Sequence, residues 1–516
     1  MAVEQLLRFL ASPVILASIA LITIPAICIY NRCCHGISHV PGPFLASLTN
    51  WWRLLKVWGR RPELVHIALH EKYGDVVRLG PNTVSVCDPQ AVKAIYALNA
   101  GYVKSGFYPV QQTIARGRPL HSMFNTTDER FHAKLRRAVS NAYAMSTLVQ
   151  FEPLVDSTTV AFLKQMDERY ADKEGQKGVC DFGAWLQYYA FDVIGELTYS
   201  KRLGFVDRGV DVDGIISNLE WLLDYVAVIG QMPFLDSVFL KNPLRLWFNK
   251  LGMMKNTAVV NFARERIAER HGAKTSEKPA SKSGSRDFLS RFEEAHKRDP
   301  DFIPQERVLA LTVANMFAGS DTTAISFRAV FYYLLRQPET LKKLMDELED
   351  PARALFTDGL VKWNQVHDLP YLSAVIKEAL RCHPAVGLTL ERVVPPTGIT
   401  AAGHFIPGGT IVGCNAWVLH RNEKIFGSRP LEFRPERWID ATPEARSDMN
   451  SMLFSFGAGA RTCIGKNISL LELHKLVPAV LHRYELSLVD AEKGWSLHNA
   501  WFVKQNDFFV TLKTRT

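Results

Sequence analysis

The sequence predicts a mainly α-helical protein with a smaller β part, preceded by one N-terminal transmembrane helix. Three observations favour this fold class. Apolar residues recur at helical spacing over most of the chain, most clearly across residues 304–337. β-Branched alternation is confined to short runs, such as residues 75–86 and 508–512. An uncharged apolar run covers residues 9–30.

Length and composition describe an ordinary globular protein. The chain has 516 residues, of which 47% are hydrophobic and 22% are charged, so disorder is not expected. One compact core rarely holds so many residues, which favours a large multilobed fold. The net charge of +9 comes from scattered basic residues, without a pattern that would indicate nucleic-acid binding. The eight cysteines are spread out without a CxxC pair, as in a reducing compartment.

The apolar run over residues 9–30 predicts a membrane anchor. As a helix it would extend about 33 Å, enough for a bilayer core of ~30 Å. The alternative is a cleaved signal peptide, whose apolar region is usually shorter, ~7–15 residues. Arg32 and the basic residues after it place the body in the cytosol by the positive-inside rule. We therefore expect an anchor over 1–35, a proline-rich hinge over 36–50 and one large domain over 51–516.

Local signals place the other elements in chain order. Gly80-Pro81-Asn82 splits residues 75–86 into a hairpin, and Asp128 suits the N-cap of a helix. Glycine, proline and polar residues predict loops over 101–125 and 271–286. The expected helices cover 51–72, 88–96, 128–144, several segments to about 270, 304–337, 371–382 and 468–480. The expected strands are a short one ending at 393, then 399–405, 410–416, 485–489 and 508–512.

The helix over 304–337 has an unusual centre. Ala318-Gly319-Ser320-Asp321-Thr322-Thr323 places a glycine, an aspartate and two threonines where helix propensity should be high. Taken alone, this segment is equally compatible with a kinked amphipathic helix whose polar residues face water.

A single cysteine, Cys463, lies between glycines where a loop becomes a helix. Free backbone N–H groups and the helix dipole stabilise a thiolate there, which makes it a good metal ligand. Gly457, Gly459 and Gly465 would let the backbone approach a flat ligand. Phe456 could cover the thiolate and Arg461 could meet an anionic group. The alternatives are a buried structural cysteine and a dinucleotide-binding glycine motif. The second fails because the third glycine is misplaced and no βαβ unit follows.

The stretch around Cys463 resembles the haem-binding signature of the cytochrome P450 family, Phe-x-x-Gly-x-Arg-x-Cys-x-Gly. Phe456, Gly459, Arg461, Cys463 and Gly465 fill every fixed position. The resemblance implies a cytochrome P450 fold and haem b, iron protoporphyrin IX, with Cys463 as the axial iron ligand.

The helix centre resembles the oxygen-activation segment of the same family. The resemblance implies that Ala318 and Gly319 make room for dioxygen. It also implies that Thr322 donates a hydrogen bond to the bound dioxygen and that Asp321 relays protons from solvent.

Further motifs of the family follow in its order. Glu378 and Arg381 lie three residues apart, an ordinary surface pair if taken alone. The resemblance makes them a Glu-x-x-Arg motif that pairs with Arg437 to fix the Cys463 loop. It also assigns haem-propionate contacts, with His132 replacing the usual tryptophan; these fall on His132, Arg136, Arg392 and Arg461. Lys104 is a further candidate that could equally be solvated.

These features imply a membrane-anchored haem-thiolate monooxygenase, an oxidoreductase that uses O2. The expected electron source is NADPH, through a separate cytochrome P450 reductase, with cytochrome b5 as a second partner. The expected location is the endoplasmic reticulum membrane, single-pass, with the catalytic domain in the cytosol. In and around these motifs, the sequence resembles filamentous-fungal microsomal members of the family, which include pisatin-demethylase-like enzymes. Many such enzymes tailor secondary metabolites.

The substrate is expected to be an apolar small molecule. The pocket candidates, each of which could be plain core, are Phe107, Phe317, Ala318, Val386, Leu388 and Trp501. Two other classes of function stay open: a haem-thiolate isomerase or dehydratase without net oxygenation, and a non-enzymatic haem-binding sensor.

Overall fold

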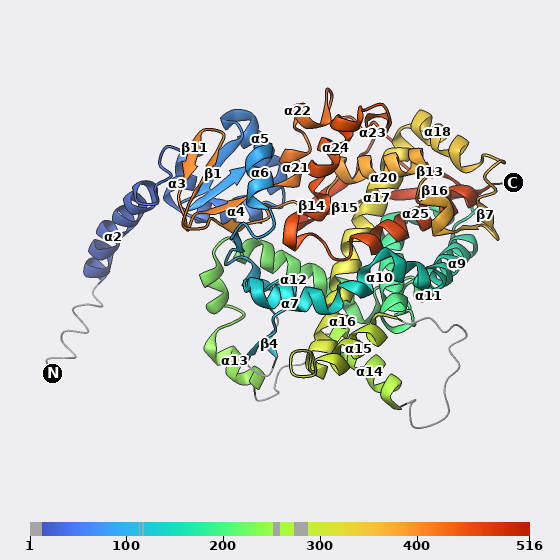
Figure 1. Cartoon of the computed structure of the whole chain (residues 1–516), viewed down its shortest axis with the longest axis horizontal. Coiled ribbons are helices and arrows are strands. Elements are labelled where there is room, and N and C mark those ends of the chain that lie inside the picture. Colours follow the sequence, from blue (N-terminus) through green and yellow to red (C-terminus); the bar gives the residue numbers. More distant parts are fainter. Residues whose placement is uncertain (1–12, 113, 116–117, 251–257, 273–286, 516) are drawn as a thin grey trace.

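The N-terminal helix α2 (Pro13–Cys33) projects away from the rest of the molecule (Figure 1). The structure is a computed structural model that describes residues 13–112, 114–115, 118–250, 258–272 and 287–515. Residues 9–12 of the expected anchor lie outside this part. Within it, the helix long and apolar enough to cross a membrane is Gln305–Arg336, which is mostly buried as a core helix is, and Ala20–Cys33 is a shorter apolar helix. The expected transmembrane anchor therefore remains a prediction.

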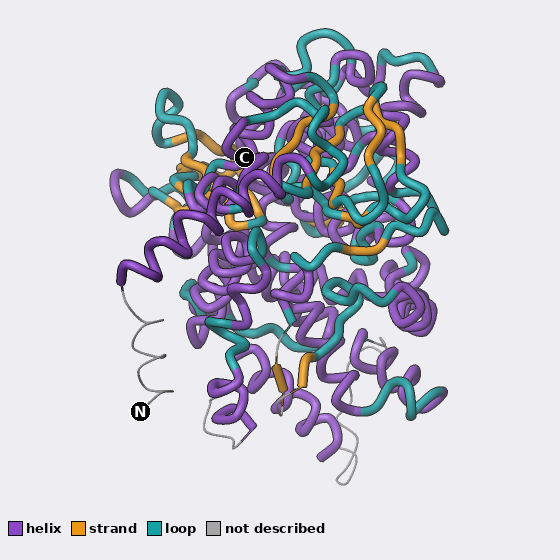
Figure 2. Tube along the Cα trace, turned by 90° about the vertical axis from the view of Figure 1, so that its left-hand side faces the viewer, coloured by secondary structure: helices purple, strands orange, loops and turns teal. Residues whose placement is uncertain are grey.

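Helices make up most of the body, and in Figure 2 they dominate the lower part of the molecule. The break expected in the central helix is present: α16 (Gln305–Gly319) and α17 (Asp321–Arg336) meet at Ser320. The other helices of eight or more residues are α4 (Trp51–Trp58), α5 (Pro62–Tyr73), α7 (Glu129–Val139), α9 (Glu152–Arg169), α10 (Phe182–Tyr199), α12 (Ile215–Ile229), α13 (Pro243–Lys250), α14 (Ala258–Gly272), α15 (Phe288–Arg298), α18 (Pro338–Leu348), α20 (Pro370–Cys382), α24 (Pro443–Met452) and α25 (Lys466–Arg483).

The main sheet lies beside α4, α5 and α6 (Pro89–Ile95), at the end of the body from which α2 projects (Figure 1). Its strand order is β1-β2-β12-β9-β3, and the strands are β1 (Val76–Gly80), β2 (Thr83–Val86), β12 (Ile411–Gly413), β9 (Arg392–Val393) and β3 (Val103–Lys104). β12 runs parallel to β2, whereas β9 pairs antiparallel with β12 and β3. The register places Lys104 opposite Arg392, so two basic residues 288 positions apart share one edge of the sheet.

Smaller β units complete the fold. β13 (Tyr484–Leu488) and β16 (Phe509–Thr514) pair antiparallel, and β6 (Cys180–Asp181) extends their sheet. β14 (Ser496–Ala500) and β15 (Phe502–Asn506) form a hairpin whose turn residue, Trp501, has φ 75°. The remaining pairs are β10 (Ile399–Ala401) with β11 (His404–Ile406), β4 (Ile114–Ala115) with β5 (Arg118–Pro119), and β7 (Phe356–Thr357) with β8 (Leu360–Val361).

The chain between α2 and α4 packs against the main sheet. Ile37 and Val40 are buried, and a Cβ on Gly42 would lie 2.4 Å from the Arg78 carbonyl oxygen. The buried Arg78 guanidinium donates hydrogen bonds to the carbonyl oxygens of Asn31 at 2.7 Å and of Arg32 at 3.1 Å. The expected proline hinge is therefore held to the body, and residues 44–48 of it form a short helix, α3 (Phe44–Leu48).

Most expected elements have counterparts in the structure. The hairpin of β1 and β2 and the Asp128 cap are confirmed, since Asp128 accepts hydrogen bonds from the backbone N–H groups of Arg130 and Phe131. The helix expected over 51–72 is instead two helices, because Arg60 takes φ 61° and Pro62 begins a new one. Of the loop expected over 271–286, residues 273–286 lie outside the described part.

Candidate functional site

Side-chain hydrogen bonds explain the break between α16 and α17. The hydroxyls of Ser320 and Thr322 donate to the carbonyl oxygens one turn earlier, of Met316 at 2.8 Å and of Ala318 at 2.9 Å. Such back-bonding bends helices. A Cβ on Gly319 would lie 3.0 Å from the Ile194 side chain of α10. The smallness of Gly319 therefore serves helix packing, whereas Ala318 is exposed although Met316 and Ser320 beside it are buried.

Cys463 lies at the N-terminus of α25, as the loop-to-helix pattern predicts. Its backbone N–H donates to the Phe456 carbonyl oxygen at 2.8 Å. Burial raises the pKa of the Cys463 thiol, and the backbone N–H groups of Gly465 and Lys466 and the charge of Arg136 oppose that rise. The amides thus stabilise the sulfur as expected, but burial prevails. A bound metal cation would favour the thiolate.

The Cys463 side chain is exposed, although it lies in a densely packed part of the protein. Tyr143 connects this loop to α16: its backbone carbonyl accepts from the Asn467 side chain at 3.0 Å, and its hydroxyl donates to Asn315 at 2.5 Å. Asn315 lies one turn before the exposed Ala318. We conclude that Cys463 and the helix break border an internal space.

The two glycines of the Cys463 motif have different roles. Gly459 has φ 66°, and a Cβ there would lie 1.8 Å from the Tyr96 carbonyl oxygen. Gly459 therefore allows the loop to contact the end of α6, in addition to any ligand. A Cβ on Gly465 would meet only the Cys463 sulfur, at 3.9 Å, and Ile468, at 4.0 Å.

A cluster of buried and partly buried basic residues surrounds His132. Burial and the charges of the neighbouring cations lower the pKa of His132 to about 3, so its imidazole is neutral. The cations that act on it are Arg461, Arg136, Lys104 and Arg392. Four of the five residues come from the predicted propionate contacts, and Lys104 joins them from β3. Sequence reasoning left Lys104 open because only the sheet register places it beside Arg392.

Arg461 is the member of this cluster with the most protein partners. It pairs with Glu129 at 2.6 Å and donates to the carbonyl oxygens of Met123 at 3.0 Å and Thr126 at 3.1 Å. Glu129 was missed, although its place three residues before His132 puts both on one helix face. Burial, Arg392 and Arg461 lower the pKa of Lys104 in the same cluster, and the Glu129 carboxylate opposes that shift. Three arginines against this carboxylate leave an excess of partly buried positive charge, which favours an anionic guest.

Asp321 lies at the start of α17, buried beside α10. The Gln187 side-chain amide donates to Asp321 Oδ1 at 2.5 Å, and the Gln187 oxygen accepts from Arg328 at 3.0 Å. Because arginine has only donors, this contact fixes the orientation of the Gln187 amide. Burial raises the pKa of Asp321, and Lys504, Arg328 and the Gln187 donor oppose the rise. Neither Gln187 nor Arg328 belongs to a motif that the sequence singled out.

Glu378, Arg381 and Arg437 form the expected cluster. Glu378 pairs with Arg381 at 2.8 Å and with Arg437 at 3.2 Å, and all three side chains are almost fully buried. The Trp438 indole also donates to Glu378, at 2.8 Å. Each charge is thus extensively hydrogen-bonded, as a buried ion cluster requires.

His420 connects this cluster to the Cys463 loop. One ring nitrogen lies 2.9 Å from the Arg381 carbonyl oxygen, and the other accepts from the Phe454 backbone N–H at 2.8 Å. Burial lowers the pKa of His420 to about 3, so the ring is neutral, with one donor and one acceptor. Sequence reasoning missed His420, because a single histidine in a loop carries no signal of such a role.

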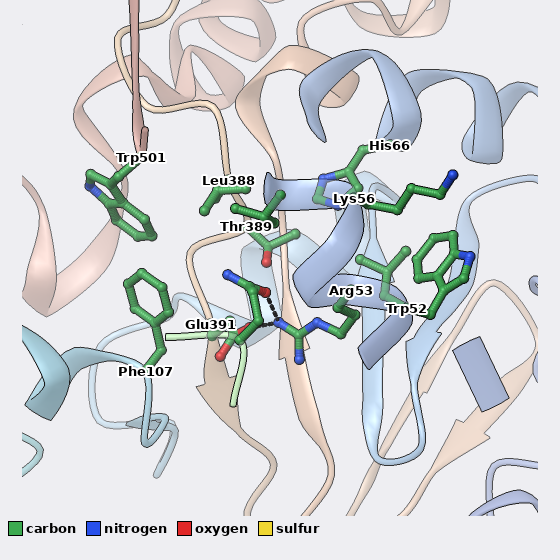
Figure 3. A pocket seen from close by; sticks show the side chains of 12 residues that line it. Trp52, Arg53, Lys56, His66, Phe107, Leu388, Thr389, Glu391 and Trp501 are labelled. Atoms are coloured by element: carbon green, nitrogen blue, oxygen red, sulfur yellow. Dashed lines mark hydrogen bonds and ion pairs between the residues drawn. The ribbon is translucent and has the colours of Figure 1, made fainter. Parts of the chain in front are cut away.

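Four of the six pocket candidates belong to one apolar cluster. Phe107 and Trp501 stack with ring centroids 4.7 Å apart, Leu388 belongs to the same apolar cluster, and all three are buried. They line the narrow pocket of Figure 3, about 10 Å³, which is room for roughly one water. Val386, the fourth member, is partly buried and bridges to Phe502. Phe317 packs on the main core, and Ala318 is exposed.

An ion pair closes the other side of this pocket. In Figure 3 the Arg53 guanidinium points at Glu391, and Gln231 completes the contact at 2.8 Å. Ser105 also donates to Glu391, at 2.5 Å. These contacts join Arg53 on α4 to Glu391, just before β9, and to Gln231, just after α12. Arg392, of the cationic cluster, is the next residue along the chain from Glu391.

Comparison with known proteins agrees with this architecture. The cytochrome P450 family model matches residues 41–510, and the chain belongs to the cytochrome P450 family. The residues present fit the haem of this family: the exposed cysteine sulfur can bind the iron, and the excess of partly buried positive charge suits two carboxylates.

Several fungal proteins are similar to the chain over nearly its full length. A cytochrome P450 monooxygenase of Aspergillus terreus is 45% identical over 87% of the chain and 90% of its own length. The monooxygenase cicH of Emericella nidulans is 43% identical over 93% of the chain and 94% of its length. One from Aspergillus flavus is 38% identical over 96% of the chain and 97% of its length.

Proposed function

We propose that this protein is a haem-thiolate monooxygenase that inserts one oxygen atom from O2 into an apolar small molecule, as a tailoring step in fungal secondary metabolism. It is an oxidoreductase. The observation that carries the proposal is the Cys463 sulfur, supported by backbone amides and open to an internal space beside the broken helix. The fungal relatives named as monooxygenases support this activity over an isomerase, a dehydratase or a sensor.

The chain offers ligands for each part of the haem. Cys463 would ligate the iron, with Phe456 beside it, and His132, Arg136, Arg392 and Arg461 would face the propionates. Thiolate-ligated haem, when bound, activates dioxygen so that one oxygen atom enters the substrate and the other leaves as water. Burial and the charges of Arg392 and Arg461 lower the pKa of Lys104, and a propionate beside it would favour the charged amine.

Asp321 and Thr322 would deliver protons to the reaction site. Thr322 is partly exposed toward the internal space, and its hydroxyl donates to the Ala318 carbonyl, so its oxygen can accept a proton and pass one on. Asp321 is the adjacent carboxyl, held by Gln187 on the side of α10. An ion pair of Lys504 and Glu220, both of which act on the Asp321 pKa, lies toward α12 and β15. Asp321 would thus shuttle protons between that side and Thr322.

The class of enzyme also suggests the electron source and the cellular location of the protein. NADPH would supply electrons through a separate reductase, with cytochrome b5 as a second candidate donor. Helix α2, with the apolar residues before it, would anchor the protein in the endoplasmic reticulum membrane. The basic residues after α2 would keep the catalytic domain, 51–516, in the cytosol.

Labelled oxygen tests the proposed reaction. A spectral screen of apolar compounds against the membrane-bound holoenzyme would first find a ligand that perturbs the haem. With NADPH, a fungal P450 reductase and ¹⁸O2, we expect the product to carry one ¹⁸O atom. Product without ¹⁸O would instead indicate an isomerase or dehydratase, and binding without turnover would indicate a sensor.

The Cys463→Ala variant tests the ligand itself. We expect the red-shifted Soret band of the reduced carbon-monoxide complex to disappear, because no thiolate remains to donate to the iron. Cys382→Ala is the matched control, since this partly buried cysteine lies at the end of α20 and should leave the band in place. An unchanged spectrum in Cys463→Ala would refute the assignment.

A further inference from the structure

A second cavity lies apart from the Cys463 site, behind the Glu378 cluster. Its volume is about 110 Å³, room for several waters at ~10–15 Å³ each. The ends of α17 and α20, the segment after α21 (Ala416–Leu419) and the start of β14 enclose it. Its lining is formed by Tyr333, Arg381, Cys382, His383, Trp417, His420, Arg421, Pro430, Leu431, Trp495 and Leu497.

Arg421 brings an unpaired positive charge to this cavity. Its guanidinium lies 5.9 Å from the Trp417 ring centroid and, among the residues that the structure describes, forms no hydrogen bond or ion pair. It is half-buried, and burial lowers its pKa, which indicates incomplete solvation. A partly desolvated guanidinium without an acceptor is unfavourable.

Tyr333 adds a hydroxyl to the same place. Its ring stacks on Phe433 with centroids 4.8 Å apart, which fixes the direction of the side chain. Burial raises the pKa of the Tyr333 hydroxyl, and the positive charges of Arg381 and Arg421 oppose that rise. Tyr333 lines the cavity together with both arginines. Within the described part of the chain the hydroxyl has no hydrogen-bond partner.

The residues that line the cavity leave it positive. The exposed Glu71, outside this lining, acts on the Arg421 pKa but forms no ion pair with Arg421 in the described part of the chain. The Arg381 N–H groups are all occupied, by Glu378 and by the carbonyl oxygens of His420, Pro430 and Glu432. Glu378 is shared with Arg437, so two arginines already divide one carboxylate. No carboxylate is among the residues that line the cavity. Arg421 is thus the cation whose donors are available.

We propose that this cavity binds a small oxyanion, held by the Arg421 guanidinium and the Tyr333 hydroxyl. Two acceptor oxygens on one atom match the planar fork of an arginine, and a phosphate or a carboxylate provides them. The anion would join the ends of α17 and α20 to the segment after α21. This site is independent of the haem chemistry and stabilises the folded protein by an amount that rises with the logarithm of the anion concentration once the site is filled.

The test uses full-length holoenzyme and two probes, inorganic phosphate and acetate, each compared with chloride at equal ionic strength. We expect at least one probe to raise the thermal midpoint by about 2 °C at saturation. For phosphate, ³¹P line broadening should report the same binding directly. Phosphate or acetate acting alone would identify which oxyanion the site prefers.

Variants separate the site from general ion effects. Arg421→Gln should abolish both the shift and the broadening, and Tyr333→Phe should weaken binding several-fold. Arg353→Gln removes an exposed positive charge paired with Asp350 and should bind as the wild type does. If Arg421→Gln folds poorly, Arg421→Lys keeps the charge but loses the fork, and should bind more weakly. Equal effects of chloride and both probes, or undiminished binding in Arg421→Gln, would overturn the proposal and leave a cavity filled by water.

Discussion

Gly459 has no room for a side chain. It combines φ 66° with a contact in which a Cβ would lie 1.8 Å from the Tyr96 carbonyl oxygen. Gly459→Ala must therefore move either the Cys463 loop or the end of α6. We expect a loss of about 1–3 kcal/mol from strain alone and a much smaller fraction of haem-bound protein. Unfolding curves and the reduced carbon-monoxide spectrum measure the two effects.

Gly403→Ala separates the effect of backbone strain from the effect of a steric clash. Gly403 has φ 81°, but a Cβ there meets no atom within 4 Å. This variant should lose only the cost of its backbone conformation and keep full haem content. Equal haem loss in both variants would show that the contact with Tyr96 is unimportant.

Gln187 acts on Asp321 through one hydrogen bond, which its side-chain amide donates to the carboxylate. Gln187→Leu removes the N–H donor, which favours the ionised carboxylate, so the Asp321 pKa should rise. The carboxylate then persists only at higher pH, and proton delivery should fail over a wider acid range. We expect the product formed per NADPH consumed to fall, with its pH profile moved upward. Peroxide release measured from pH 6 to 9 reports the uncoupling.

Two further variants test this expectation, one at the titrating group itself and one as a control. Asp321→Asn removes the titrating group and should slow turnover on the order of 100-fold. Gln165→Leu loses a hydrogen bond to Arg169 on α9 and should leave the pH profile unchanged. Full coupling in Asp321→Asn would contradict the proton-relay role.

At the scale of elements, the Glu378 cluster joins α20 to α23 (Glu436–Ile439). Glu378→Gln leaves Arg381 and Arg437 buried without a counter-charge. We expect a loss of about 3–5 kcal/mol in the free energy of unfolding, the usual result of breaking a buried pair from one side. Denaturant unfolding of the haem-bound protein measures it.

Glu432→Gln is the matched control for this loss. Glu432 pairs with Arg429 at 3.1 Å, but both side chains are at least half exposed, so about 0–1 kcal/mol should be lost. Similar losses in the two variants would mean that burial does not determine the energy of the Glu378 cluster.

The sequence predicts elements better than the contacts between them. The β1–β2 hairpin, the Asp128 cap and the break at Ser320 follow from turn chemistry, capping and propensity, all of which act within a few residues. The pairing of Arg461 with Glu129 and the place of Lys104 beside Arg392 depend on tertiary contacts between segments far apart in the chain. The stacking of Phe107 on Trp501 was equally invisible, because apolar spacing does not distinguish a closed core from an open pocket.

For the whole molecule, buried histidines predict sensitivity to acid. Five histidines outside the cluster around His132 are also buried, and burial lowers the pKa of each to about 3 or 4: His66, His70, His383, His420 and His474. Below the unfolded value of about 6.5, the unfolded chain binds these protons and the folded chain does not. Stability should therefore be intact above pH 6.5 and fall steadily from there toward pH 4, by up to about 1.4 kcal/mol per pH unit for each histidine.

Urea unfolding at several pH values between 7.5 and 4.5 measures this slope. His474→Asn should reduce this pH dependence by the contribution of one histidine. His39→Gln, which changes an exposed residue between α2 and α4, should not reduce it. A stability that stays constant from pH 7 to 5 would contradict the buried neutral state of these rings.

The contacts of Arg78 have a consequence for the protein at a bilayer. Because this buried guanidinium holds the carbonyl oxygens of Asn31 and Arg32, α2 leaves the body at a set angle. A helix that crosses the bilayer would then pass its tilt on to the catalytic domain, which could not swivel freely about a loose tether. One face of the domain would remain turned toward the lipid headgroups and the opposite face toward soluble partners. The orientation in which the enzyme meets its substrate and its reductase would thus be determined by an arginine far from the haem.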